Sequence, residues 1–147
     1  MADARIRVEY RDSARNRPTL RFSIPSKLLL NHFIGMFRSL AEGPEIVKLS
    51  DLPFIELDSI REIELIYIGD RKEPPRRLQP GKRRAFFRWI HDSEGWIWCA
   101  ELAEALKHPG HQYFDYGENN DVDIEAYFLE DELQKDRRGS PRISSRC

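Results

Sequence analysis

Residues 84–107, RAFFRWIHDSEGWIWCAELAEALK, hold all three tryptophans, two of the eight phenylalanines and one of the two cysteines of this 147-residue chain. Aromatic side chains bury more area than most others, so we expect the core to form around this stretch. All three tryptophans are therefore predicted to be buried. The rest of the fold is expected to pack against them.

The pattern inside this stretch predicts three successive elements. Residues 85–91 form a buried strand, and 92–95, with the sequence DSEG, have the composition of a type I turn closed by glycine. Trp96 and Trp98 then share one face of a short extended piece. An amphipathic helix is predicted from about 99 to 107, where a following proline and glycine end it.

Two hairpins are predicted on either side of this core. Residues 5–11 alternate apolar and charged side chains, and 20–24 repeat the alternation, so the first hairpin has an arginine-rich outer face. Residues 112–116 and 122–128 form the second hairpin, whose outer face is acidic. One face of each hairpin is expected to meet the core, as is usual in antiparallel sheets.

A long amphipathic helix is predicted over 27–41, with Ser26 as its N-cap and Gly43 just beyond its end. Residues 46–60 show no sustained period and are expected to form an irregular connection, with one short strand around 54–57. Residues 63–67 alternate again and predict another strand.

These elements predict an α+β fold, with a mostly antiparallel sheet of five to six strands packed against two helices. The length suits one domain, which we place at residues 1–133. Residues 134–147 are polar and basic and are expected to form a disordered tail.

Composition and cysteine usage predict a cytoplasmic protein. The formal net charge is −1, so no overall field attracts nucleic acid or an anionic membrane. Cys99 and Cys147 do not make a disulfide framework, which favours a reducing compartment. Residues 1–10 lack the apolar segment of a secretory signal, and the longest apolar run, 28–34, is too short to cross a membrane. No membrane contact is expected.

The acidic hairpin is the first candidate site, because its carboxylates follow one another without an intervening base. With His108 and His111 nearby, such side chains can bind a divalent metal. The spacing does not fit a calcium loop of the EF-hand type, so we expect no metal and no cofactor. The hairpin is instead predicted to bind a partner through five acidic residues: Asp115, Glu118, Asp121, Asp123 and Glu125.

The stretch from Arg71 to Arg84 is the second candidate site. It holds many bases and Glu73 as its one acid, and its prolines and glycine predict an exposed, extended loop. Arg76, Arg77 and Arg83 are the residues we assign to partner binding. Such a loop can neutralise phosphates without reading sequence, which makes a nucleic-acid accessory protein one alternative.

Signatures of catalysis are absent from the sequence. It has no G-x-S-x-G motif and no glycine-rich phosphate-binding motif. His91 and Asp92 are adjacent and can pair to orient a general base, and Cys99 is interpreted as a small buried hydrophobic residue. The enzymatic alternative is a small enzyme or metal-dependent hydrolase with its site in the loop from His108 to Asp123.

The leading hypothesis is a small, non-enzymatic cytosolic domain that binds another protein. Its acidic sheet face is expected to hold a partner with a basic surface, as charge complementarity favours. Inhibitor and immunity proteins that neutralise basic toxins share this charge and size, which is an analogy and not a motif.

Overall fold

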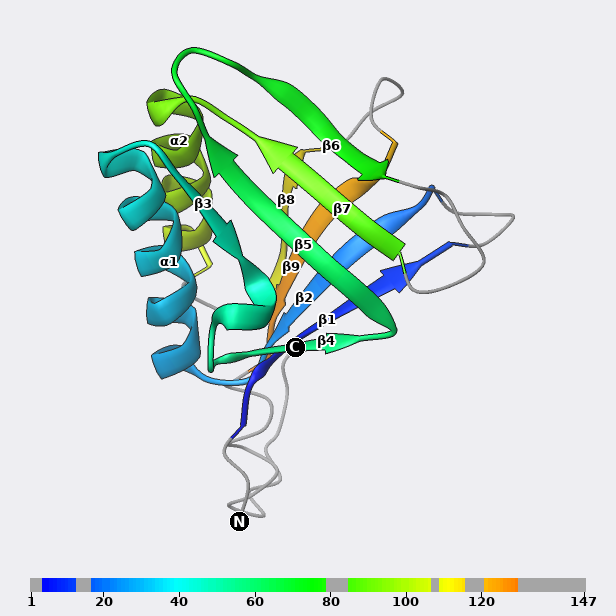
Figure 1. Cartoon of the computed structure of the whole chain (residues 1–147). Coiled ribbons are helices and arrows are strands. Elements are labelled where there is room, and N and C mark those ends of the chain that lie inside the picture. Colours follow the sequence, from blue (N-terminus) through cyan, green and yellow to red (C-terminus); the bar gives the residue numbers. More distant parts are fainter. Residues whose placement is uncertain (1–3, 13–16, 79–84, 107–108, 116–120, 130–147) are drawn as a thin grey trace, which may run out of the picture.

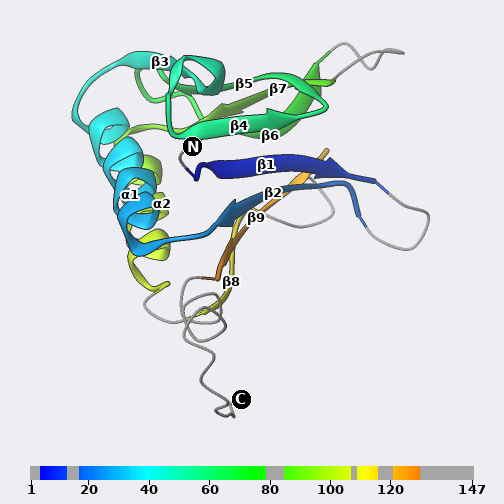
Figure 2. The same cartoon turned by 90° about the horizontal axis from the view of Figure 1, so that it is seen from below.

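Two facing β-sheets, closed along one side by two helices, make up the described fold in this computed structural model (Figures 1 and 2). The structure describes residues 4–12, 17–78, 85–106, 109–115 and 121–129. Within these ranges it has nine strands in a five-stranded and a four-stranded sheet. The predicted α+β class is confirmed, but the strands form two mixed sheets where one mostly antiparallel sheet was expected.

The five-stranded sheet joins both predicted hairpins. Strands β1 and β2 are antiparallel, as are β8 and β9, and the two hairpins meet where β2 and β9 pair in parallel. Strand β4 lies within one residue of the short strand expected at 54–57, and it adds in parallel beside β1. The order is β4 (Ile55–Asp58), β1 (Ile6–Arg11), β2 (Thr19–Ile24), β9 (Asp123–Phe128) and β8 (Gly110–Asp115).

The four-stranded sheet is built around a parallel pair, β5 and β7, with an antiparallel strand at each edge. Its order is β3 (Glu45–Lys48), β5 (Ile60–Tyr67), β7 (Ala85–Ile90) and β6 (Glu73–Leu78). Strand β6 lies inside the stretch predicted to be a basic loop, so that prediction is wrong for 73–78. Pro74 and Pro75 are accommodated because β6 is an edge strand, where a missing ladder donor is tolerated.

Helix α1 (Lys27–Glu42) is capped as predicted, because the Ser26 hydroxyl accepts a hydrogen bond of 3.1 Å from the Leu29 amide. Gly43 ends the helix in an extended conformation with φ −173°, and not in the left-handed one of a glycine C-cap. A short 3-10 helix (Leu49–Asp51) then links β3 to β4. In the described parts of the chain, neither α-helix combines the length and apolar character that crossing a bilayer requires.

Helix α2 (Ser93–Glu104) starts well before the predicted Cys99. The expected turn at 92–95 is its first turn, and the Asp92 carboxylate caps it by accepting a 2.8 Å hydrogen bond from the Gly95 amide. Residues that are two positions apart in sequence lie about 200° apart around the axis of an α-helix. Trp96 and Trp98 therefore cannot share a face. Trp96 is fully buried, whereas Trp98 is 46% exposed, which corrects its predicted burial.

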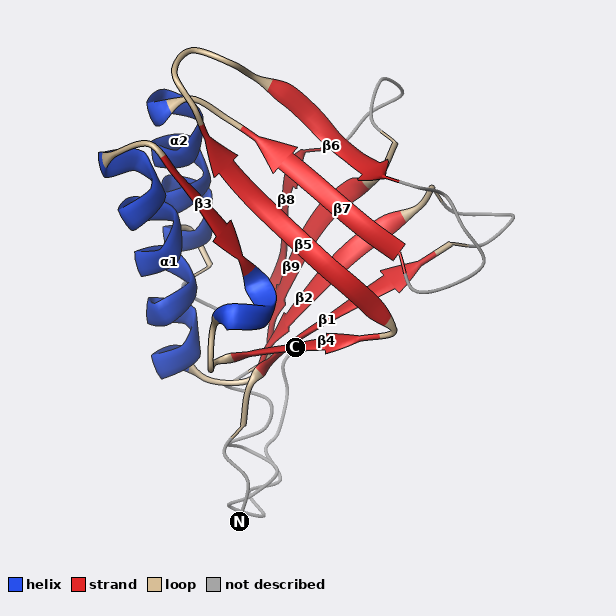
Figure 3. Ribbon diagram, in the orientation of Figure 1, coloured by secondary structure: helices blue, strands red, loops and turns tan. Residues whose placement is uncertain are grey.

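The core does form around the aromatic stretch. Trp89 of β7 and Trp96 of α2 lie 5.0 Å apart between ring centroids, and Phe37 of α1 stacks on Trp96 at 5.8 Å. Phe114 of β8 reaches Phe37 at 5.6 Å. One buried aromatic cluster therefore joins both sheets and both helices, whose arrangement Figure 3 shows by element type.

Candidate functional site

The acidic side chains on the outer face of β9 are not exposed to solvent. Asp123 and Glu125 point away from the core, yet their residues are only 9% and 8% exposed. The cause is the neighbouring strand, because the parallel register places Thr19 opposite Asp123 and Arg21 opposite Glu125. The outer side chains of β2 cover the two carboxylates.

Basic side chains compensate both carboxylates within the sheet. The Nε of Arg17 donates to the two carboxylate oxygens of Asp123 at 3.3 and 3.1 Å. Arg21 Nε lies 4.0 Å from one oxygen of Glu125, and His111 Nδ1 contacts the other. The arginine-rich face and the acidic face that we predicted separately thus neutralise each other.

Aromatic rings complete this outer polar cluster, which we define as Arg17, Arg21, His111, Asp123, Glu125 and Tyr127. The guanidinium of Arg21 lies 4.6 Å from the ring centroid of Tyr127, and that ring stacks on His111 at 4.4 Å. An open hollow of about 610 Å³ adjoins the cluster at Asp123 and Glu125. The contact of His111 with Glu125 is an imidazole–carboxylate pair, an arrangement that suits the small-enzyme hypothesis.

A metal site is not assembled by these side chains. Within the residues that the structure describes, no group of three or more histidine, cysteine, aspartate or glutamate side chains is placed to hold a metal ion. His108 lies outside those residues. The acidic run is therefore divided between paired carboxylates and residues that point elsewhere.

Asp115 is one of the residues that point elsewhere. The register of β8 shifts between Tyr113 and Asp115, and this bulge turns the carboxylate toward the inner layer. There it accepts a 2.7 Å hydrogen bond from Trp89 Nε1 and lies 3.1 Å from His91 Nε2. Asp115 is therefore part of the core boundary and not of an acidic outer face.

His91 and Asp92 are adjacent in sequence and were considered as a pair that could orient a general base. In the structure their side chains have separate partners. His91 contacts Asp115, while Asp92 caps α2 and lies 3.4 Å from Lys72 Nζ. The hydrogen bond from the Gly95 amide, reinforced by Lys72, lowers the pKa of Asp92 below its usual range. This carboxylate is therefore held in its ionised, capping form.

Cys99 lies fully buried on α2. Burial raises the pKa of its thiol well above the ordinary value, and the Asp115 carboxylate adds to the effect. The reactive thiolate is disfavoured on both counts. Cys99 acts as a small apolar side chain, as the sequence predicts.

The other residues predicted to bind a partner, Asp121, Glu118 and Arg83, do not form a patch within the described chain. Asp121 is exposed just before β9. Glu118 and Arg83 lie outside the described residues.

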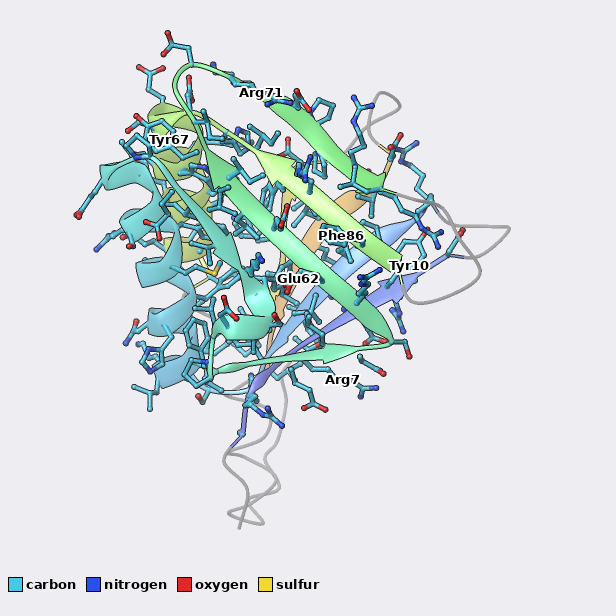
Figure 4. The ribbon with its side chains drawn as sticks, in the orientation of Figure 1. Arg7, Tyr10, Glu62, Tyr67, Arg71 and Phe86 are labelled. Carbon is cyan, nitrogen blue, oxygen red and sulfur yellow. The ribbon has the colours of Figure 1, made fainter. Side chains whose placement is uncertain are left out.

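Arg76 and Arg77 sit next to each other on β6 and so point to opposite faces of the sheet. Arg76 is exposed, and the guanidinium of Arg77 lies 5.3 Å from the ring centroid of Tyr10. Figure 4 shows Tyr10 at the end of the two layers that lies away from the helices. Because only one of the two arginines is free to meet a partner, β6 gives little support to a phosphate-binding patch.

The exposed side of α2 is a surface that our interpretation of the sequence missed. Ile97 and Trp98 are both about half exposed, and Glu94 and Glu101 flank them one turn away on either side. We define the α2 face as Glu94, Ile97, Trp98, Glu101 and Glu104. The helical period would have revealed it, had Asp92 been recognised as the N-cap.

A groove of about 390 Å³ continues the α2 face toward α1. Its α2 wall includes Ile97 and Ala100, and its α1 wall includes Ala41 and Glu42. Arg38 of α1 pairs with a glutamate of the α2 face across this groove. The groove has an apolar floor between acidic edges, which suits an apolar side chain that projects from a basic surface.

Comparisons with known proteins give this chain no relative. No family model, curated protein or solved structure matches it significantly.

Proposed function

We propose that this chain is a protein-binding domain that holds a partner with a basic surface on the α2 face. The observation that carries the proposal is Trp98, which is 46% exposed on a regular helix beside the exposed Ile97. Tryptophan is the residue type most enriched among side chains that dominate interface energies. An exposed pair of this kind in the middle of a helix favours docking of another protein.

The charge around Trp98 supports a partner with a basic surface. Glu94 and Glu101 lie on either side along the helix, and Glu42 faces the groove from α1. Arg38, the basic residue among the groove's lining, is paired with Glu104. An acidic rim around an apolar centre speeds association with a basic surface and disfavours acidic partners.

The acidic hairpin supports this proposal less than its sequence predicts. Two of its carboxylates, Asp123 and Glu125, are compensated by Arg17, Arg21 and His111. Asp115 is committed to Trp89 and His91. The expected basic partner is therefore retained, and its docking site is transferred from the hairpin to α2.

Tryptophan fluorescence offers a direct test, because Trp89 and Trp96 are buried and Trp98 is the exposed tryptophan. The probes are a synthetic amphipathic helix of lysine and leucine and a matched peptide with glutamate in place of lysine. The lysine peptide should shift the emission to shorter wavelength, and added salt should weaken its binding. The glutamate peptide should leave the emission unchanged.

Two variants decide whether the response belongs to the α2 face. Trp98→Ala should abolish binding of the lysine peptide, measured by calorimetry because the fluorophore is lost. Tyr113→Ala removes another half-exposed aromatic, on the outer face of β8, and should bind as the unaltered chain does. Equal binding of both peptides, or undiminished binding to the Trp98→Ala variant, would reject the proposal.

A further inference from the structure

The free edge of the four-stranded sheet offers a second binding surface, on the other side of α1. Strand β3 pairs with β5 on one side only and ends the sheet on the other. Figure 3 shows it running beside α1. Ile46, in the middle of this strand, is 53% exposed. Natural proteins usually protect such an edge, because its unpaired backbone groups can pair with another strand.

A groove of about 340 Å³ runs between this edge and α1. Met36 of α1, Val47 of β3 and the linking residue Leu52 give it an apolar lining. At one end His32 stacks on Phe54, with 5.2 Å between ring centroids, and the groove continues there into a wider hollow beside Arg5. A strand edge with an apolar trough beside it is the geometry that binds peptides by strand addition.

Gly35 lies on the α1 wall of this groove. It occupies the middle of the helix, where glycine lowers stability relative to alanine. A Cβ built at Gly35 would meet no atom within 4 Å, so packing within the described protein does not require glycine here. The missing side chain keeps the groove wide enough for another backbone to approach.

We propose that this groove binds an extended segment of a partner protein, which adds to β3 as a further strand. Unpaired strand backbone specifies an extended occupant, and the apolar lining specifies apolar side chains at alternate positions. Glu45 begins β3 and lines the groove, and Lys48 ends β3 on the opposite face of the strand. The bound segment therefore carries a basic residue beside Glu45 and an acidic residue beside Lys48. This surface and its mode of binding are independent of the α2 face.

Random decapeptides displayed on phage and selected on the full chain test this proposal. Enriched sequences should alternate apolar and polar residues, with opposite charges at their two ends. A synthetic peptide of the enriched sequence should bind the Gly35→Ala variant roughly tenfold more weakly or worse, because the added methyl group narrows the groove. The same variant should melt at a higher temperature, since alanine favours the helix.

Matched controls separate this groove from other surfaces. Gly43→Ala also adds a methyl group in open space, at the end of α1, and should leave peptide affinity unchanged. The Trp98→Ala variant should bind the peptide normally. If docking on the α2 face were rejected, the result for this groove would therefore still stand.

Backbone methylation tests the strand-addition step itself. In an added strand, every second N–H group faces β3 and the others face away from it. N-methylation of the groups that face β3 should abolish binding, and N-methylation of the other groups should be tolerated. The proposal is overturned if both methylated peptides bind, if neither binds, or if no sequence is enriched. It is also overturned if the Gly35→Ala variant binds equally well, or if a second copy of the chain occupies the β3 edge in solution.

Discussion

Two tryptophans that are two positions apart have opposite environments. Trp96 is fully buried against Trp89 and Phe37, and its indole N–H donates to the carbonyl of Ile66 at 3.1 Å. Trp98 is 46% exposed. We predict that Trp96→Ala lowers the free energy of unfolding by about 3–5 kcal/mol, because a large cavity remains.

Trp98→Ala should lower that free energy by about 1 kcal/mol or less, because only part of the ring leaves a packed environment. Urea unfolding of both variants measures the difference. Similar losses for the two substitutions would contradict the helical start at Ser93, on which the α2 face depends.

Two helical glycines should respond in opposite ways to the same substitution. A Cβ at Gly95 would lie 2.4 Å from Nδ1 and 2.6 Å from Cγ of His91, whose ring packs on Trp96 and contacts Asp115. Gly95→Ala is therefore expected to lower the free energy of unfolding by about 1–3 kcal/mol, as overpacking does. Gly35→Ala should raise it by roughly 0.5–1 kcal/mol. Equal effects in thermal or urea unfolding would show that His91 is not held in place.

At the scale of an element, the start of α2 depends on the charge of Asp92. The hydrogen bond from the Gly95 amide, and then Lys72, lower the pKa of this carboxyl from its usual value of 3.8. A carboxyl with a lowered pKa stabilises the folded state above its unfolded pKa, and the contribution disappears as the pH falls through the folded pKa.

Asp92→Asn keeps a capping oxygen but removes this titration. We expect the unaltered chain to be more stable than the variant at about pH 7, and the difference to shrink by about pH 3. Urea unfolding at the two pH values measures it. A difference that stays constant would show that the charge of Asp92 does not contribute.

The pairing of β2 with β9 should depend on Arg21. The side chains of Arg21 and Glu125 are mostly buried, so removing the guanidinium leaves a carboxylate with less compensation. Arg21→Ala is expected to destabilise the fold by about 2–3 kcal/mol. Arg7 pairs with Asp58 on the same outer face but is exposed, and Arg7→Ala should leave the free energy of unfolding nearly unchanged. Equal losses would mean that burial of the β9 carboxylates has little energetic effect.

The elements that sequence patterns predicted correctly are those with one buried face. Strands β1, β2 and β9 alternate apolar and polar residues, and α1 follows the helical period and has a capping serine, so their patterns were unambiguous. Strand β3 is short and exposed, and β6 contains two prolines, so neither shows the usual alternation. The sequence DSEG suits a turn and a helix N-terminus equally well, which is why the start of α2 was misplaced.

At the scale of the whole molecule, the candidate site depended on contacts that local patterns do not contain. Arg17 and Asp123 are 106 positions apart, and they meet only because β2 and β9 pair in parallel. The sequence therefore predicted the acidic residues but not their arginine partners. Trp98 is a different case, because its exposure follows from the local start of α2 at Ser93.

The two helices place the proposed surfaces on different sides of the molecule. The α2 face and its groove use Arg38, Ala41 and Glu42 of α1, whereas the groove at β3 uses Gly35 and Met36. Helix α1 therefore separates the two surfaces, and its buried side packs into the aromatic core through Phe37.

A basic partner is proposed to dock on the α2 face and not on the acidic hairpin. Photo-crosslinking in the cells that make the protein compares the two sites, with benzoylphenylalanine in place of Glu101 in one variant and of Asp121 in the other. Both positions are exposed and acidic. We predict a discrete protein adduct from position 101, lost when Trp98→Ala is added, and none from position 121. An adduct from position 121 alone, or one from position 101 that persists without Trp98, would contradict the claim.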